Sequence, residues 1–282
     1  MGSRQILQIL NSRDTSDGDG VRIRRTLGHH RHDLDPFLML DEIRSADSAD
    51  YIGGFPPHPH RGIETLTYML NGGFVHEDNH GHRAELKNGG AQWMSTGRGV
   101  IHSELPLIRD GLLHGFQLWI NLPAVQKMKA PEYRQAEGDE IPEVSLAGGG
   151  TARVFGGTWL LDCNALASPL ASLACNARTL DLQLPANASL TLSLPVNDTL
   201  LAYVYDGRLA TAPAVQRGQL ARFSAGETVT LSASEEGVRL LLLAGTPLGE
   251  PIAHYGPFVM NTEEEIRQAI DDYRNGRFGD KP

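Results

Sequence analysis

Short segments in which apolar and polar residues alternate make up most of the first 250 residues, and Gly, Pro and Asn turns separate them. An alternation with a period of two is typical of a β-strand with one face in a core. The clearest examples are the segments 21–27, 66–70, 91–94 and 113–122, with turn signals such as Asn71-Gly72-Gly73 between them. Helical periodicity is almost absent before residue 250. The pattern therefore predicts an all-β fold of the barrel or sandwich kind.

The second half of this pattern repeats the first in the same order. Leu201–Gly207 matches Leu66–Gly72 at an offset of 135, Gly218–Ala233 matches Gly89–Glu104 at an offset of 129, and Arg239–Pro247 matches Gly115–Pro123 at an offset of 124. Three blocks that recur in order predict two β-barrels of one architecture. We expect an N-terminal barrel over residues 1–130, a C-terminal barrel over 131–250 and a tail over 251–282.

The tail carries a clear helical signal. Thr262 and Glu265 form a capping-box motif, acidic residues occupy the first turn, and Asn275-Gly276 is a C-cap signal. The sequence predicts one helix of about three turns, and its apolar face, with Ile266, Ile270 and Tyr273, is expected to dock on a barrel. We interpret His254, upstream of the helix, as a structural residue that fastens the tail.

Composition and charge narrow the function classes. The chain has 282 residues, of which 40% are hydrophobic and 21% charged, which is typical of globular proteins. Met1–Leu10 lacks a secretory pattern, and no apolar run is long enough to span a membrane, so we expect a cytoplasmic protein without membrane association. Only Cys163 and Cys175 are present, and we interpret both as reduced structural residues. The net charge of −9 argues against direct binding to nucleic acid.

The candidate chemistry lies in two short motifs, FPPHPHRGIE and TGRGVIHSE. His58 and His60 are two residues apart in the first, and His102 and Glu104 are two apart in the second, so each pair projects from one face of a strand. An isolated pair of this kind is usually a surface feature of a polar strand. Two facing strands, however, would bring three imidazoles and one carboxylate to a single cation, a set that suits a first-row transition metal. Leaving these groups buried and unpaired would be costly, so the two pairs together predict a metal site.

The second barrel does not repeat these ligands. At the offsets of the internal repeat, the four candidate positions become Ser193, Pro195, Leu231 and Ala233. The chemistry is therefore expected in the first barrel, with the second as a structural partner. The remaining histidines are interpreted as supporting or exposed: His29, His30 and His32 lie in a charged loop, and His76, His80 and His82 lie on a long hairpin arm, where His82 could approach the mouth of the site.

Five blocks of the chain together resemble pirins, which are members of the cupin superfamily: DPFLMLDE, FPPHPHRGIETLTYML, GGAQWMSTGRGVIHSE, GFQLWINLP and GPFVMNTEEEIRQAIDDY. The resemblance is strong over residues 20–125, weaker over 140–240, and strong again in the tail. It implies a bicupin with one iron site in the N-terminal barrel and no ligands in the second. Carried over residue by residue, the ligands are His58, His60, His102 and Glu104. The implied metal is Fe(II), with Mn, Ni, Cu or Zn as alternatives.

Glu64 is a rival carboxylate, because the H-x-H-x3-E pattern supplies the metal carboxylate in many cupins. On a regular strand it would lie four residues past His60, or ~13 Å away at ~3.3 Å per residue, which is too far for the same ion. A bend at Gly62 would be needed to bring it back. We therefore expect Glu64 to hold a ligand imidazole in one tautomer rather than to bind the metal.

The resemblance to pirin-like quercetinases implies an iron-dependent dioxygenase that uses O2 to open the central ring of a flavonol such as quercetin, with release of carbon monoxide. Four protein ligands on an octahedral ion leave two positions for substrate and O2. Glu104 is the catalytic candidate, because a carboxylate at the metal edge can accept the flavonol hydroxyl proton.

Two other functions are compatible with the same residues. Pirins are also described as regulators, which would make this chain a non-enzymatic metal or redox sensor that binds a partner protein. A metal-loaded protein that consumes no O2 with any flavonol would favour that role. A closed four-ligand zinc site would instead indicate an ion that only stabilises the barrel.

Overall fold

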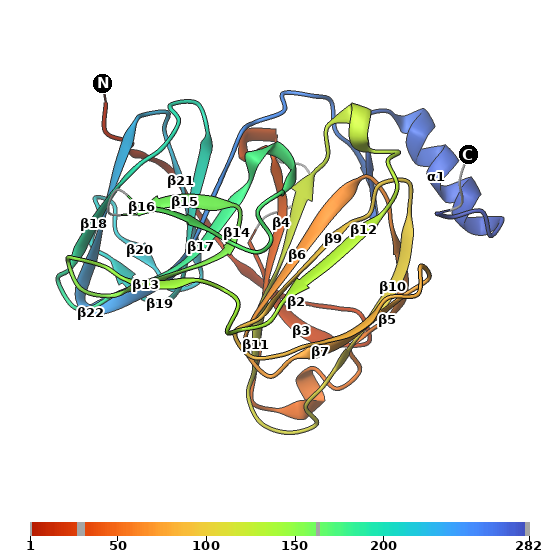
Figure 1. The fold of residues 1–282 in the computed structure, drawn as a ribbon, viewed down its shortest axis with the longest axis horizontal. Helices are drawn as coiled ribbons and strands as arrows, with labels where there is room; N and C mark the ends of the chain where they lie inside the picture. The colour runs from red at the N-terminus through yellow and green to blue at the C-terminus, as the bar shows by residue number, and fades with distance from the viewer. Residues whose placement is uncertain (1, 27–31, 162–163, 280–282) are drawn as a thin grey trace. The chain divides into compact units, whose positions relative to one another are not determined.

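The structure, a computed structural model, describes residues 2–26, 32–161 and 164–279 (Figure 1). The expectations for Leu27, His29, His30 and Cys163 lie outside these residues. Residues 14–139 and 248–282 form one compact unit, here called the first unit, and residues 1–13 and 140–247 form the second unit. The sequence predicted contiguous ranges, whereas each of these units combines two separate segments of the chain. The opening strand pairs within the second unit, and the tail packs within the first.

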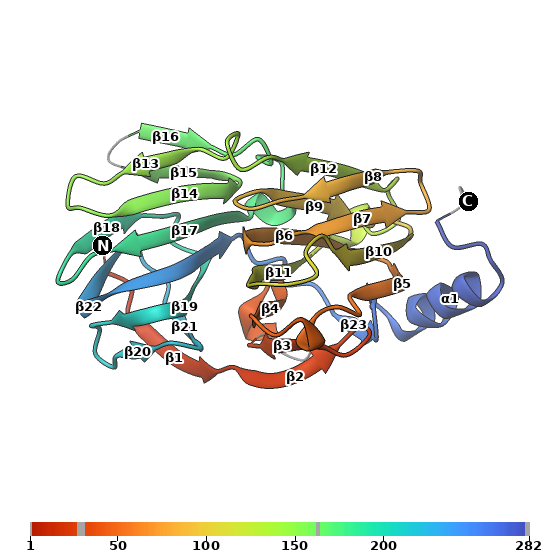
Figure 2. The same cartoon turned by 90° about the horizontal axis from the view of Figure 1, so that it is seen from below.

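The first unit contains a seven-stranded and a four-stranded antiparallel sheet (Figures 1 and 2). The larger sheet has the order β12 (Glu132–Ala136), β9 (Ala91–Ser95), β6 (Ile63–Asn71), β11 (Leu113–Asn121), β4 (Phe37–Ser45), β3 (Val21–Arg25) and β2 (Arg13–Asp17). The smaller sheet has the order β5 (Phe55–His60), β10 (Val100–Pro106), β7 (Phe74–Asp78) and β8 (Arg83–Leu86). Side chains from the two sheets meet, as in the hydrogen bond between Thr67 of β6 and Glu104 of β10. Three short 3-10 helices join the strands: η1 (His32–Leu34), η2 (Ser48–Asp50) and η3 (Ala124–Gln126).

The second unit is built on one large sheet. Its order is β1 (Ile6–Asn11), β21 (Gln219–Phe223), β19 (Thr199–Leu209), β22 (Thr228–Gly245), β17 (Arg178–Leu184), β14 (Thr151–Gly156) and β13 (Glu143–Ser145). In addition, β18 (Ser189–Ser193) pairs with β22, β20 (Val215–Gln216) pairs with β19, and β15 (Thr158–Leu161) pairs with β16 (Asn164–Ala167). A 3-10 helix, η4 (Ala174–Asn176), precedes β17. Cys175 lies within it.

The internal repeat is confirmed by the strand pairings. The order β9-β6-β11-β4 in the first unit recurs as β21-β19-β22-β17 in the second. The residue register also recurs: Leu66 pairs with Trp93 and Tyr68 with Ala91, while Leu201 pairs with Arg222 and Tyr203 with Leu220. These pairs preserve the offsets of 135 and 129 seen in the sequence. The prediction of an all-β protein with two domains of one architecture and a short C-terminal helix is therefore confirmed.

The structure corrects the residues that replace the ligands in the second unit. His102 pairs with His58 and Val100 with His60, whereas Leu231 pairs with Leu190 and Val229 with Leu192. The equivalents of His58 and His60 are therefore Leu190 and Leu192, not Ser193 and Pro195. Between β5 and β18 the offset is 132 rather than 135, because the connection from β18 to β19 is longer than the one from β5 to β6. Both leucines lie in the buried core, so apolar packing fills the corresponding place.

The predicted C-terminal helix is α1 (Glu263–Arg274), and Thr262 and Glu265 form its capping box. It follows the hairpin of β23 (Ala253–Tyr255) and β24 (Phe258–Met260), and Figure 2 shows it beside β23. Ile266 and Ala269 are buried in a cluster with residues of this hairpin, and Ile270 packs against the cluster. The helix thus docks in the first unit, while Tyr273 remains 40% exposed. Among the described residues, no helix is long and apolar enough to cross a membrane.

Buried polar contacts fasten the tail next to His60. Arg61 is 3% exposed, and its guanidinium donates to Asp272 Oδ2 at 2.8 Å and lies 4.7 Å from the centre of the Phe278 ring. The buried Lys127 ammonium donates to the carbonyls of Gly62 and Val259, each at 2.9 Å. A buried charge needs such partners to be tolerated. The tail therefore stabilises the end of the strand that carries His58 and His60.

The Arg61–Asp272 pair predicts a pH-dependent contribution to stability. Burial raises the pKa of Asp272, but the hydrogen bonds of Arg61 and Gln268 and the charges of Arg61 and Arg277 lower it below the ordinary 3.8. Since the folded-state pKa is depressed, the contribution is present above 3.8 and is lost as the pH falls through the depressed value. We expect Asp272→Asn to melt below the wild type at neutral pH. Thermal unfolding across an acid series should show the difference closing, and a difference that is constant with pH would contradict this role.

Candidate metal centre

The pairing of β5 with β10 brings three of the four predicted ligands together. His102 lies opposite His58, and His60 is two residues further along the same strand. The ring centroids are 4.4 Å apart for His58 and His102, 4.8 Å for His58 and His60, and 5.1 Å for His60 and His102. One nitrogen of each ring lies within 4.8 Å of those of the other two, which is a spacing that a single ion can bridge.

The protonation state of these imidazoles suits a cation. His60 and His102 are 3% and 1% exposed, and burial, followed by the neighbouring His58, lowers both pKa values well below 6.5. Both rings are therefore neutral at neutral pH, which is the form that binds metals. Nδ1 of His60 and Nε2 of His102 are buried and have no hydrogen-bond partner among the described residues. Unpartnered buried nitrogens are costly, so a metal ion fits this donor set.

Glu104 lies beside the three histidines rather than among them. A β-bulge between His102 and Glu104 shifts the pairing with β5, so that Glu104 lies opposite Phe55. The carboxylate is 5% exposed, and its Oε1 accepts hydrogen bonds from Thr67 Oγ1 at 3.4 Å and Gln92 Nε2 at 3.3 Å. Both hydrogen bonds fall on the same oxygen, which leaves Oε2 for another partner.

A cavity of about 700 Å³ opens on this cluster, and His58, His60 and Glu104 line it. Most of its other walls are apolar or aromatic, with Met39, Phe55, Phe74 and Trp119 among the lining residues. Trp119 meets His60 edge to face, with ring centroids 5.0 Å apart. His254 and Pro257 of the tail also line the cavity. The site therefore combines a polar metal-ligand set with an apolar chamber of ligand-binding size.

One wall of the cavity carries charges that are already paired. Arg25 Nη2 contacts Asp17 Oδ2 at 2.7 Å and Asp41 Oδ2 at 2.6 Å. Burial lowers the pKa of Arg25, but the two carboxylates outweigh it and raise the pKa overall. The guanidinium is thus charged and occupied by the chain itself. This wall contributes a fixed polar surface rather than a free anion-binding group.

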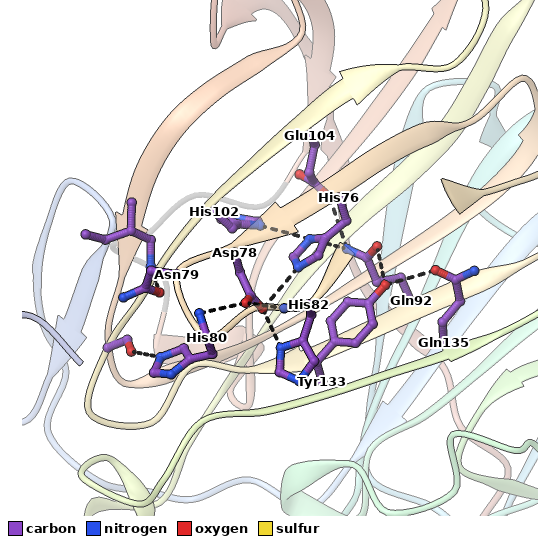
Figure 3. Close-up of polar contacts among 12 residues, drawn as sticks. His76, Asp78, Asn79, His80, His82, Gln92, His102, Glu104, Tyr133 and Gln135 are labelled. Atoms are coloured by element: carbon purple, nitrogen blue, oxygen red, sulfur yellow. Dashed lines mark hydrogen bonds and ion pairs between the residues drawn. The ribbon is translucent and has the colours of Figure 1, made fainter. Parts of the chain in front are cut away.

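The hairpin-arm histidines have three different environments (Figure 3). His76 of β7 is fully buried, and its Nδ1 is 3.4 Å from Nδ1 of His102. His80 Nε2 is 3.2 Å from the carbonyl of Gly99. His82, with 44% of its side chain exposed, bonds to Asp78 and does not line the cavity. The supporting role expected for this group therefore suits His76, and His82 is an exposed residue.

Glu64 lies on β6, after a bend at Gly62, whose φ is +81°. It is 1% exposed, and alternation along β6 turns it to the face opposite Thr67, whose side chain reaches Glu104. Its carboxylate is 4.0 Å from the Lys129 ammonium. Asp78 is a carboxylate that contacts a histidine behind the site, and sequence reasoning missed it. The spacing of His76 and Asp78, two residues apart on one strand, was the signal for it.

Two like-ordered cupin-type sheets, with a histidine cluster in only the first among the described residues, define a bicupin with one candidate metal centre. A family model described as Pirin matches residues 20–120, and one described as the Pirin C-terminal cupin domain matches residues 179–279. The chain is 47% identical to "Putative quercetin 2,3-dioxygenase" of Vibrio cholerae and 44% identical to a pirin-like protein of Caulobacter vibrioides. The first match covers 98% of both chains, and the second covers 99% of this chain and 100% of the relative. The chain belongs to the pirin family.

Among solved structures, quercetin 2,3-dioxygenase from Acinetobacter baumannii superposes with a TM-score of 0.88 at 33% identity, over 99% of each chain. A bacterial pirin from Escherichia coli in complex with nickel(II) superposes with a TM-score of 0.62 at 18% identity, over 85% of this chain and 99% of that one. The second likeness shows the fold alone. The resemblance to pirins and the bicupin fold expected from the sequence are confirmed.

Proposed function

We propose that this chain is a metal-dependent dioxygenase that cleaves a flavonol such as quercetin, with one Fe(II) ion held by His58, His60, His102 and Glu104. The observation that carries the proposal is the cluster of neutral imidazoles at the wall of the 700 Å³ cavity. The 33% identity to a quercetin 2,3-dioxygenase over 99% of both chains supports it.

The cavity has the size and lining that a flat aromatic substrate requires. Small-molecule sites are usually apolar chambers of about 300–1,000 Å³ with a few polar groups that fix orientation. Phe55, Phe74 and Trp119 provide aromatic surface for the flavonol rings. Arg25, which is paired with two carboxylates, and Gln117, which bonds to Thr67, add polar edges for its hydroxyl groups. These walls hold the reactive edge of the substrate against the histidine cluster.

Glu104 is proposed to accept the flavonol hydroxyl proton, because the deprotonated flavonol is the form that binds a cation. Thr67 and Gln92 anchor Oε1, and Oε2 remains for the metal or the proton. When bound, iron supplies the one-electron chemistry with O2 that amino-acid side chains lack. The chain contributes the orientation of the substrate, the acceptor for its proton and the exclusion of water by the apolar walls.

The proposal is tested with protein loaded anaerobically with Fe(II). Adding quercetin should perturb the flavonol absorption band, and admitting O2 should bleach it with release of carbon monoxide. Metal-free protein is the control and should do neither. Iron-loaded protein that binds no flavonol would overturn the dioxygenase. Binding without bleaching would also overturn it and would favour a sensor that signals to a partner protein.

A further inference from the structure

The structure assigns a positioning role to His76 and Asp78: they hold His102 in the tautomer that presents its Nε2 to the metal. This inference rests on the proposed metal site. Asp78 Oδ2 is 3.3 Å from His76 Nε2, and His76 Nδ1 is 3.4 Å from His102 Nδ1 (Figure 3). Asp78 and His76 have 2% and 0% of their side chains exposed. A continuous buried chain therefore runs from a carboxylate to the back of the candidate ligand.

The proton on each ring follows from the carboxylate. Asp78 is surrounded by donors: its Oδ1 accepts from the backbone N–H groups of His80 at 2.9 Å and His82 at 3.1 Å, and its Oδ2 lies 2.8 Å from His82 Nδ1 and 3.3 Å from His76 Nε2. An ionised carboxylate can only accept, so the His76 nitrogen that faces it, Nε2, carries a proton. Nδ1 of His76 is then the acceptor of the ring, because the Gln92 NH2 group, which can only donate, faces it at 3.3 Å.

The bare nitrogen of His76 in turn fixes His102. Two atoms face this acceptor, Nδ1 of His102 at 3.4 Å and Nε2 of Gln92 at 3.3 Å. Because a nitrogen without a proton can only accept, His102 can bond to it only by donating from Nδ1. His102 is thus protonated at Nδ1, and its Nε2 is left without a proton. That Nε2 is the buried nitrogen for which the structure shows no partner. Metal-binding histidines commonly have their second nitrogen held by an acceptor in this manner.

Aromatic packing keeps His76 in the required plane. The Tyr133 ring of β12 stacks on His76, with centroids 4.6 Å apart and planes at 23°, and on His82 at 5.2 Å and 22°. The Tyr133 hydroxyl shares its single proton between Gln135 Oε1 at 2.9 Å and Gln92 Oε1 at 3.2 Å, and the Gln92 amide turns its NH2 group toward His76 and Glu104. A residue from a different strand thus locks the supporting chain.

The same residues suggest a competing arrangement, in which His76, His102 and Glu104 hold a second ion. Their candidate ligand atoms also lie within 4.8 Å of one another. However, the Gln92 NH2 group donates into the middle of this set, to Nδ1 of His76 and Oε1 of Glu104. A cation there would meet two N–H groups and lose both hydrogen bonds. The geometry therefore favours support of one ion over a second site.

Two variants test the inference through metal affinity, measured without substrate by competition of a chelator for Co(II). In Asp78→Asn, the amide can donate to His76 Nε2, which frees His76 to protonate Nδ1 and pushes the proton of His102 toward Nε2. In His76→Phe, the stack with Tyr133 is retained but the hydrogen bonds to Asp78, His102 and Gln92 are lost. We expect each to weaken Co(II) binding by about 10–100-fold. The matched control, His80→Gln, changes an exposed imidazole of the same hairpin whose ring contacts the Gly99 carbonyl, and it should bind Co(II) as the wild type does.

A spectroscopic readout separates positioning from a general loss of structure. Nitrogen NMR of the metal-free wild type should show His76 protonated at Nε2 and His102 at Nδ1, and Asp78→Asn should reverse this pattern while the backbone spectrum is retained. Wild-type affinity and tautomers in Asp78→Asn would overturn the inference. So would two Co(II) ions per wild-type chain with one lost in His76→Phe, since His76 would then be a ligand. A failure of flavonol turnover alone would contradict the proposed function and leave these measurements unaffected.

Discussion

A chain carrying both His58→Ala and His102→Ala is expected to lose its metal, from about one ion per chain to almost none. The two rings face one another across β5 and β10 with centroids 4.4 Å apart, so the double change removes both sides of the cluster. His60 and Glu104 alone cannot surround a transition metal that requires four or more protein ligands and solvent positions. Metal analysis of freshly purified protein measures the effect directly.

The control for this change removes two histidines outside the cluster. His32→Ala with His80→Ala deletes an exposed residue of η1 and a residue whose ring bonds the Gly99 carbonyl. This variant should retain its metal. Because an ion that binds only the folded state raises the melting temperature, the wild type should melt higher with metal than without, and the His58/His102 variant should not. A metal content that stays near one ion per chain in the His58/His102 variant would show that the ion is bound elsewhere.

Local rules were sufficient to predict the three clustered histidines and the tail helix. The i, i+2 spacing of His58 and His60 places both on one face whenever the segment is a strand, whatever the rest of the fold. The capping box of Thr262 and Glu265 likewise acts within one turn. The internal repeat could be found because its turn glycines recur at constant offsets, and the paired strands of both units confirm it.

Features that depend on long-range packing were not predictable in the same way. His76 lies in a polar hairpin segment that looks exposed, but Tyr133, more than fifty residues later in the chain, covers it. Glu64 is near His60 in sequence, and which face of β6 it occupies depends on the sheet that β6 joins. The positions that correspond to His58 and His60 are Leu190 and Leu192 rather than Ser193 and Pro195 because one connection differs in length between the two units. Alternating patterns do not reveal such a difference.

The second large effect is expected at Glu104, with Glu64 as its matched control. In Glu104→Gln, the amide oxygen can still accept from Thr67 and Gln92, so the shape of this buried corner is preserved. A neutral amide, however, cannot accept the flavonol proton or offset the charge of the cation. Loss of a general base typically costs about 10²–10⁴-fold in rate, and we expect quercetin turnover to fall in that range. The melting temperature of the metal-free protein should change little.

Glu64→Gln makes the same chemical change at a carboxylate that is buried to a similar degree. Because Glu64 faces away from Thr67 and lies beside Lys129, we expect its metal content and turnover to equal those of the wild type. Any effect should appear instead as a lower melting temperature, since the nearby ammonium loses an anionic neighbour. Metal analysis, thermal unfolding and quercetin turnover on both variants separate the two roles. If Glu64→Gln stripped the metal while Glu104→Gln kept both metal and full turnover, the carboxylate ligand would be Glu64, and β6 would have to present its other face to the site.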